Sequence, residues 1–223
     1  MRGKRIGLML GIMLIGWIFV AGRADAALLG FDIFLPDILS NSTGTYSYDA
    51  GTDLFTSTAV PLTITFDGVT IKNITGPRSY NVSFYVDAAG NFAGGVAGDD
   101  FVISGNIDVD GNGVNDYTGD LIRGEVTEFG WFDTGTSFDL FDFTFDFTGG
   151  ALSPFYASSG YKGGNKMSSG RSNFGGSFST NFSGSQVKHD TAPVPEPASL
   201  LLLGSGLLGF TLFGRAKRKK ISA

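Results

Sequence analysis

The chain has 223 residues, among them 34 Gly, 21 Phe and a single His, and it contains no Cys. This length fits one domain of ordinary size together with targeting segments. The lack of Cys excludes disulfides, zinc–thiolate sites, iron–sulfur clusters and thiol nucleophiles, and a single His excludes a metal site built from several histidines.

Charge is distributed unevenly along the chain. Residues 1–26 carry a net charge of +3 and residues 193–223 carry +4, so residues 27–192 carry −12 within a chain whose total is −5. An acidic body of this kind repels nucleic acid, whose binding depends on neutralising phosphates. It attracts cations or cationic surfaces instead. We therefore expect no nucleic-acid partner.

The first residues have the three-part layout of a secretory signal peptide. Basic side chains among the first five residues precede an uncharged run over residues 6–20, and Ala24 and Ala26 then form a small-x-small cleavage site. We expect residues 1–26 to be removed after export by the Sec machinery, so that the mature chain begins at Ala27. The run of about 15 residues is short for a membrane span, and an uncleaved signal anchor is the alternative interpretation.

Residues 27–186 are expected to form a β-rich exported body. Short runs of β-branched and aromatic residues alternate with Gly, Asn and Asp, which is typical of strands joined by turns. No convincing helix is found between residues 27 and 190. We therefore predict an all-β sandwich or jelly-roll-like body, flanked by an N-terminal signal helix and a C-terminal transmembrane helix. The predicted strands cover residues 60–66, 80–86, 101–107, 121–129 and 141–147.

The clearest of these strands is residues 141–147. Four Phe occupy one face of it, and Asp142, Thr144 and Asp146 occupy the other. A period of two with the bulk on one side indicates one buried and one solvated face. Carboxylates in this region could in principle supply a glycosidase pair, but we interpret them as part of the solvated face. The carboxylates considered are Glu125, Glu128, Asp139, Asp142 and Asp146.

An acidic, Gly-rich segment has the spacing of a calcium loop. Asp108, Asp110 and Asn112 stand at positions 1, 3 and 5, and Gly113 stands at position 6, where a sharp turn is needed. The closing Glu of position 12 is missing, because that position is Gly119. A calcium site and a bare acidic turn both stay open as interpretations. The residues that would form the calcium site are Asp108, Asp110, Asn112, Val114, Asp116 and Asp120.

Residues 157–186 are rich in Ser, Gly and Asn, and three Phe in this stretch are spaced four residues apart. We predict a loop over 157–172 and a closing strand over 173–183, with a flexible low-complexity linker as the alternative. Residues 187–192 are expected to be the linker to the C-terminal segment, where His189 has no visible partner. Six aromatic side chains are candidates for an exposed sugar-binding platform: Tyr46, Tyr48, Tyr117, Trp131, Tyr156 and Tyr161.

The C-terminal segment, residues 193–223, combines three features. Prolines at 193, 195 and 197 favour an extended chain that a protease can bind. The apolar run 198–214 would span about 26 Å as a helix, which is enough for a thin bilayer. The five basic residues between 215 and 220 would stay in the cytoplasm by the positive-inside rule. The body would then lie on the exported side of the membrane.

This segment resembles the PEP-CTERM sorting signal in the order of its elements. Val194, Pro195, Glu196 and Pro197 carry the Pro-Glu-Pro element, a glycine-containing span follows, and the chain ends in a basic tail. The resemblance implies recognition by an exosortase, an integral-membrane, transpeptidase-like enzyme that cuts near the Pro-Glu-Pro motif and passes its substrate to the cell surface. It also implies a bacterium that makes extracellular polysaccharide and biofilm.

From these features we expect an exported protein that is first tethered at the inner membrane through 198–214 and then reaches the cell surface or the extracellular matrix, with a structural or adhesive role. We expect no enzyme, because the chain has neither a G-x-S-x-G elbow nor a phosphate-binding glycine loop. The alternative is a calcium-stabilised carbohydrate-binding module that acts on exopolysaccharide. Calcium is the one cofactor under consideration.

Overall fold

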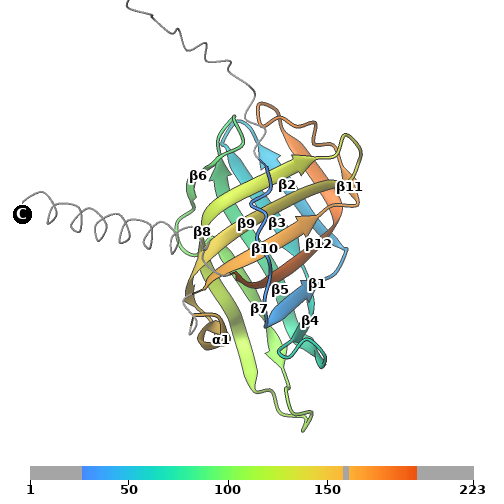
Figure 1. Ribbon diagram of the computed structural model, residues 1–223, viewed down its shortest axis with the longest axis vertical. Helices are drawn as coiled ribbons and strands as arrows, with labels where there is room; N and C mark the ends of the chain where they lie inside the picture. Colours follow the sequence, from blue (N-terminus) through green and yellow to red (C-terminus); the bar gives the residue numbers. More distant parts are fainter. Residues whose placement is uncertain (1–26, 158–160, 195–223) are drawn as a thin grey trace, which may run out of the picture.

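The computed structural model describes residues 27–157 and 161–194 (Figure 1). The expected signal peptide, residues 1–26, and the expected transmembrane helix, residues 198–214, lie outside the described residues. Within the described part, no helix has both the length and the apolar character needed to cross a membrane.

Strands dominate the described part, and one short helix accompanies them. The elements in chain order are β1 (Asp37–Ser40), β2 (Gly44–Asp49), β3 (Leu54–Ala59), β4 (Pro61–Thr65), β5 (Ile71–Val86), β6 (Phe92–Gly95), β7 (Phe101–Ile107), β8 (Tyr117–Asp133), β9 (Asp139–Gly149), α1 (Ser153–Ala157), β10 (Lys162–Ser168), β11 (Arg171–Ser172) and β12 (Phe182–Val194). Five of the predicted strands correspond to observed ones, and 101–107 matches β7 at both ends. The predicted closing strand over 173–183 is wrong, because residues 173–181 form the loop between β11 and β12.

Eight of the strands close into a ring of antiparallel pairs. Their order is β5-β3-β2-β12-β10-β9-β8-β7, and β7 pairs back with β5. The short strands β1 and β4 connect the C-terminal half of β12 to the N-terminal part of β5. β1 pairs with both β12 and β4, and β4 pairs with β5. β5 and β12 are both long strands. Along one edge, β5 pairs first with β4 and then with β3, and β12 pairs first with β2 and then with β1. Figure 1 shows β8, β9 and β10 crossing in front of β2, β3 and β5.

The all-β class is confirmed, but the arrangement is a closed barrel rather than the expected sandwich or jelly roll. All the strands belong to one sheet, which closes on itself. An alternating pattern indicates only that one face of a strand is buried, and this holds for sandwiches and barrels alike. The sequence pattern therefore could not distinguish the two arrangements.

Aromatic rings fill the barrel. Phe141, Phe143 and Phe145 on β9 are at most 1% exposed, as their alternation predicted, and the ring centroids of Phe101 and Phe145 are 4.4 Å apart. Burying one such side chain stabilises the fold by about 1.5–3 kcal/mol. The expected exposed aromatic platform is wrong for four of its six members, because their side chains are buried in this core: Tyr46, Tyr48, Trp131 and Tyr156.

The segment after β9 differs most from the prediction. The expected loop over 157–172 contains β10 and β11 instead. β10 looks like a loop in the sequence because Gly163 and Gly164 interrupt it, but a Cβ on Gly163 would lie 2.1 Å from the ring of Phe145. The expected linker over 187–192 is part of β12, whose side chains alternate between the barrel interior and the outside.

Candidate functional site

The last strand leads directly into the C-terminal segment. Pro193 and Val194 belong to β12 and pair with Gly163 and Lys162 of β10. Val194 is 5% exposed, so its side chain is buried against the barrel. Of the proposed sorting residues, Val194 is therefore held by the barrel, while 195–197 lie outside the described residues. The proposed cleavage residues Ala24 and Ala26 also lie outside them.

Residues 27–36, which we call the strap, cross the outer face of the barrel. Figure 1 shows this dark blue segment passing over β8, β9 and β10. The backbone N–H of Leu29 donates to Asp142 Oδ1 at 3.1 Å. The N–H of Phe34 donates to the carbonyl oxygen of Pro193 at 3.0 Å. The strap thus connects the start of the expected mature chain to the start of the C-terminal segment.

Glycines on the barrel make room for the strap. A Cβ on Gly130 would lie 2.8 Å from the Leu29 nitrogen, and one on Gly164 would lie 2.7 Å from the Phe31 ring. Asp142 lies beneath the strap and is only 2% exposed, so its assignment to a solvated face is wrong. Burial raises the pKa of Asp142, although the N–H groups of the strap act in the opposite direction.

Among the other candidate glycosidase carboxylates, Glu125 of β8 stands opposite Asp146 of β9, and burial together with Asp100 raises the pKa of Glu125. Asp139 is fully buried and accepts a hydrogen bond from the Thr134 N–H at 3.3 Å. Glu128 accepts one from the Thr144 hydroxyl at 3.3 Å. Asp146 lies 3.9 Å from the ammonium of Lys162. These contacts hold Glu128 to β9, Asp146 to β10 and Asp139 to the turn between β8 and β9.

The acidic segment forms an exposed loop between β7 and β8. Single carboxylate oxygens of Asp108, Asp110 and Asp116 lie within 4.8 Å of one another. Asp108 accepts hydrogen bonds from the N–H groups of Gly111 and Gly113 at 2.7 and 2.8 Å. These donors lower the pKa of Asp108 and keep it ionised.

The remaining residues of the proposed calcium loop divide into two groups. Asn112 lies within the loop, where its side-chain oxygen accepts from the Val114 N–H at 2.8 Å. Asp120 instead belongs to β8 and accepts from the Ser104 hydroxyl on β7 at 2.8 Å. The structure therefore brings three of the four proposed carboxylates together. The fourth, Asp120, lies in β8 where that strand pairs with β7.

A buried polar cluster, formed by Ser57, Asn165, His189 and Thr191, lies inside the barrel and was missed by sequence reasoning. His189 Nε2 is 3.1 Å from the Ser57 hydroxyl, and His189 Nδ1 is 3.4 Å from Asn165 Nδ2. The Thr191 hydroxyl donates to Asn165 Oδ1 at 2.9 Å. The Tyr80 ring covers the imidazole at a centroid distance of 3.9 Å. A sequence signal for this cluster does exist. In residues 187–191 the charged Lys188 and Asp190 alternate with Val187, His189 and Thr191, as expected for a strand with one buried face.

This cluster has the order of a nucleophile, a base and an orienting residue, but its environment is that of a packed core. Ser57 is 1% exposed, and its hydroxyl donates to the Thr45 carbonyl at 2.9 Å. Burial lowers the pKa of His189 to about 3, so the imidazole is neutral at neutral pH. A substrate on the surface cannot reach a hydroxyl buried in this way. The cluster satisfies polar groups inside the barrel.

Comparison with known proteins identifies one segment. The PEP-CTERM protein-sorting motif matches residues 193–219. No curated protein and no solved structure matches the chain. The chain therefore carries a PEP-CTERM sorting motif, and this motif begins at Pro193, the residue whose carbonyl oxygen is bound by the strap. The motif implies an exported, membrane-anchored precursor that an exosortase processes to the cell surface.

Proposed function

We propose that this protein is a surface or extracellular-matrix component with a structural or adhesive role, exported through the Sec machinery and released from its membrane tether by an exosortase. The observation that carries this proposal is the PEP-CTERM match over 193–219. It is supported by the overlap of β12 with the first two residues of the motif. The barrel is therefore the part of the protein that would be carried to the cell surface. The proposed tether is the apolar run 198–214.

We infer further that the barrel has no catalytic role. The support comes from the described residues that could do chemistry: Ser57 and His189 are closed off from solvent, and Asp142 is covered by the strap. Hydrolysis of a polysaccharide by the purified protein, abolished by Asp-to-Asn changes on the barrel, would contradict this inference.

The second candidate function is a calcium-stabilised carbohydrate-binding module acting on exopolysaccharide. The approach of Asp108, Asp110 and Asp116 to within 4.8 Å favours the calcium part of this proposal. Asn112 and the Val114 carbonyl would complete the ligand set, and the Asp120 position argues against that residue as a ligand. Calcium would fix the loop rather than take part in chemistry.

The intact mass of the protein from its native host, measured separately in membrane, surface and medium fractions, tests the sorting proposal. We expect the surface or medium form to lack residues 1–26 and everything beyond the Pro-Glu-Pro region. A matched variant, Glu196→Ala, should accumulate as the longer form in the membrane. A wild-type mass that retains 198–214 in every fraction would instead mean a permanent anchor, and the matrix role would be wrong.

A further inference from the structure

The basic residues of the barrel are concentrated in its last strands. Residues 27–192 contain seven Lys and Arg, and four of these lie in β10, β11 and β12: Lys162, Lys166, Arg171 and Lys188. Residues 162–192 therefore carry a net +3, while residues 27–161 carry −15. The adjacent pairing of these three strands gathers the positive charge on one part of a strongly acidic body.

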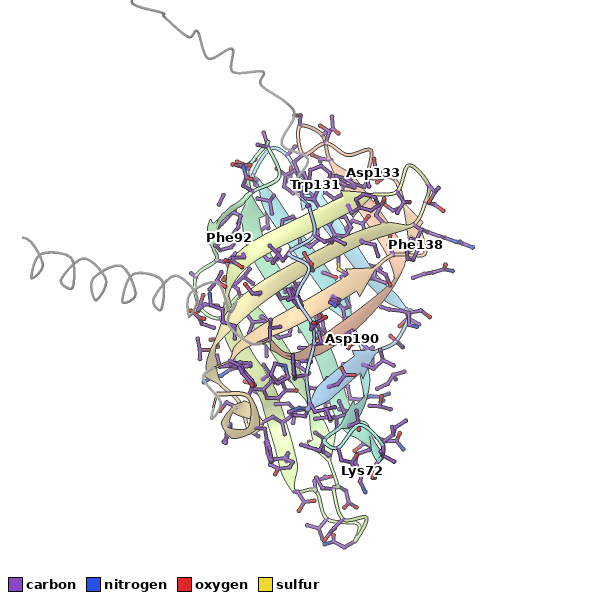
Figure 2. The ribbon with its side chains drawn as sticks, viewed as in Figure 1. Lys72, Phe92, Trp131, Asp133, Phe138 and Asp190 are labelled. Atoms are coloured by element: carbon purple, nitrogen blue, oxygen red, sulfur yellow. The ribbon has the colours of Figure 1, made fainter. Side chains whose placement is uncertain are left out.

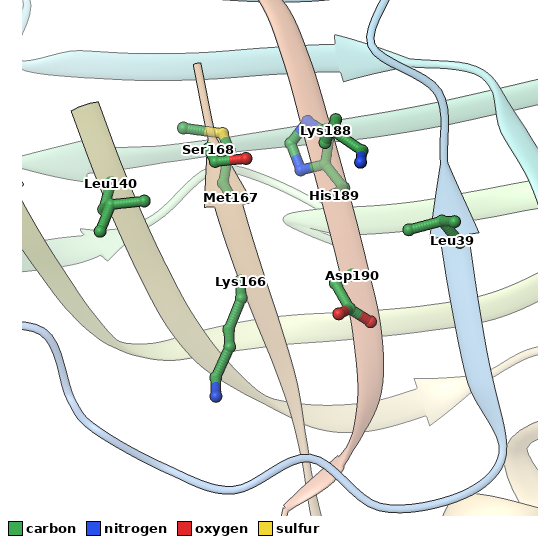
Figure 3. Close-up of a pocket in the computed structure, with 8 residues that line it drawn as sticks. All are labelled: Leu39, Leu140, Lys166, Met167, Ser168, Lys188, His189 and Asp190. Carbon is green, nitrogen blue, oxygen red and sulfur yellow. The ribbon is translucent and has the colours of Figure 1, made fainter. Parts of the chain in front are cut away.

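A groove crosses the outer face of β10 and β12 at this place (Figure 3). Ser168 stands opposite Lys188, and Lys166 stands opposite Asp190, so the two lysines are diagonal neighbours on one face. Leu39 of β1 and Leu140 of β9 line the sides. The hollow here measures about 200 Å³.

The groove continues into a second hollow of about 340 Å³, which shares Ser168 and Lys188 with the first. Ser42, Gln186 and Phe138 line this part, and Phe138 is 46% exposed. Gln186 has a φ of 56° and lies where the β12–β2 register shifts. A bulged residue other than glycine at positive φ is uncommon, and bulges often occur beside binding sites. The groove thus offers hydroxyls, an amide and an aromatic face.

The two lysines of the groove lack a close ion pair, although the Lys166 ammonium lies 5.5 Å from the Phe31 ring of the strap and its charge opposes the rise in the pKa of Asp142 that burial causes. The ion pairs found in the described part of the chain join Arg123 to Asp99 and Lys162 to Asp146, so neither Lys166 nor Lys188 has a carboxylate within 4.0 Å there. The one acidic residue of the groove, Asp190, lies diagonally across from Asp37 of β1, and burial together with Asp190 raises the pKa of Asp37 to about 8. A protonated Asp37 adds no negative charge to this part of the barrel.

We propose that this groove, formed by the outer faces of β10 and β12, binds an acidic polysaccharide. The ammonium groups of Lys166 and Lys188 bind sugar carboxylates, Ser168 and Gln186 hydrogen-bond to sugar hydroxyls, and the Phe138 ring packs against a sugar face. The acidic remainder of the barrel disfavours nucleic acid, which carries a charge every ~1.7 Å of duplex. An acidic glycan carries at most about one carboxylate per sugar, so two lysines match it better. This site deepens the proposed adhesive role and rests on it.

The test uses the full-length chain in detergent, with polygalacturonate as the acidic glycan and dextran as the neutral one. We expect saturable binding of polygalacturonate and none of dextran. The double variant Lys166→Gln/Lys188→Gln should lose about tenfold in affinity. The matched control is Lys72→Gln, because Lys72 lies near the end of the barrel away from Phe138 (Figure 2) and should leave affinity unchanged.

Polyglutamate separates sugar recognition from simple charge attraction. Phe138→Ala should weaken polygalacturonate binding but not polyglutamate binding. Equal affinities of the wild type for the two polymers, or an unchanged affinity of the double lysine variant, would overturn the proposal. Normal processing in the native host without polygalacturonate binding would refute the groove alone, whereas a retained tether would refute the proposed function instead.

Discussion

Strands β9 and β12 both alternate between the barrel interior and the outside, yet they bury different chemistry. β9 places Phe141, Phe143 and Phe145 in the core. β12 places His189 and Thr191 there, and both need partners from other strands. An apolar face is stabilised wherever it meets other apolar groups, but a buried polar group costs free energy unless its hydrogen bonds are made. β12 is therefore stable only where other strands supply partners for its polar groups, whereas the buried face of β9 needs only apolar neighbours.

The largest expected effect concerns the apolar strand. Phe145→Ala should destabilise the protein by about 3–5 kcal/mol, because the cavity cannot close around the neighbouring rings. Chemical denaturation would measure this loss. Phe132→Ala is the matched control, since that ring is 52% exposed on β8. Equal losses in the two variants would show that β9 does not form the core described above.

The next effect concerns the polar strand. His189→Leu should destabilise the protein by about 1–3 kcal/mol, because Ser57 and Asn165 lose a partner while staying buried. The pKa of His189 is about 3 in the folded state against the ordinary 6.5. The unfolded state therefore takes up the proton first, and stability falls as pH drops from 6.5 towards 3. The variant should lack this component of the pH dependence, and a slope identical to that of the wild type would contradict the assignment.

The third effect concerns the acidic loop between β7 and β8, which lies outside the core. If the loop binds calcium, a tenfold excess of calcium over its dissociation constant should stabilise the protein by about 1.4 kcal/mol. The rise in Tm should disappear in Asp108→Asn/Asp110→Asn and persist in Asp67→Asn, which changes an exposed turn elsewhere. No calcium-dependent shift in the wild type would leave the acidic turn as the correct interpretation.

A smaller effect is expected at the strap. Phe31→Ala removes a ring that lies against Gly164 and 5.5 Å from the Lys166 ammonium, and we expect a loss of about 1 kcal/mol because the ring is only partly buried. Limited digestion with proteinase K should end beyond Val194 in the wild type and enter residues 187–194 sooner in the variant. Early cleavage inside β12 of the wild type would show that the barrel does not protect the start of the sorting motif.

The last effect, which develops only as the pH rises, concerns the outer side of β12. Burial, together with the hydrogen bond and charge of Asp190, raises the pKa of Asp37 from 3.8 to about 8. The folded state therefore holds a proton that the unfolded state releases, and stability falls as pH rises from 3.8 to 8. Asp37→Asn should remove this loss, so the variant should gain on the wild type with increasing pH. Denaturation at pH 5 and pH 9 would measure the difference, and an equal difference at both values would refute it.

Strands with a regular apolar alternation could be predicted from the sequence, and strands that depend on distant contacts could not. β7 and β9 could be predicted because their apolar residues recur every second position. β10 could not, because Gly163 and Gly164 are typical of loops. The side chains of Phe145, Val194 and Phe31 explain why glycine is required there. His189 seemed to lack a partner because Ser57 is 132 residues away in the chain.

The candidate sites divide in the same way. The acidic loop and the sorting motif are local patterns, so their residues could be named before any fold was known. The groove could not, because Lys166 and Lys188 come together only through the pairing of β10 with β12. Asp142 was predicted to lie on a solvated face, because no residue near it in the sequence indicates that the strap covers it.

The sequence by itself determined the buried faces of the strands and the PEP-CTERM motif at 193–219, because each depends on residues that are neighbours in the chain. Only the tertiary structure decided the closure of the barrel, the polar cluster around His189, the cover over Asp142 and the grouping of positive charge on β10 and β12. Each of these depends on contacts between residues far apart in sequence, and their free energy is gained only when the chain closes the loops between them.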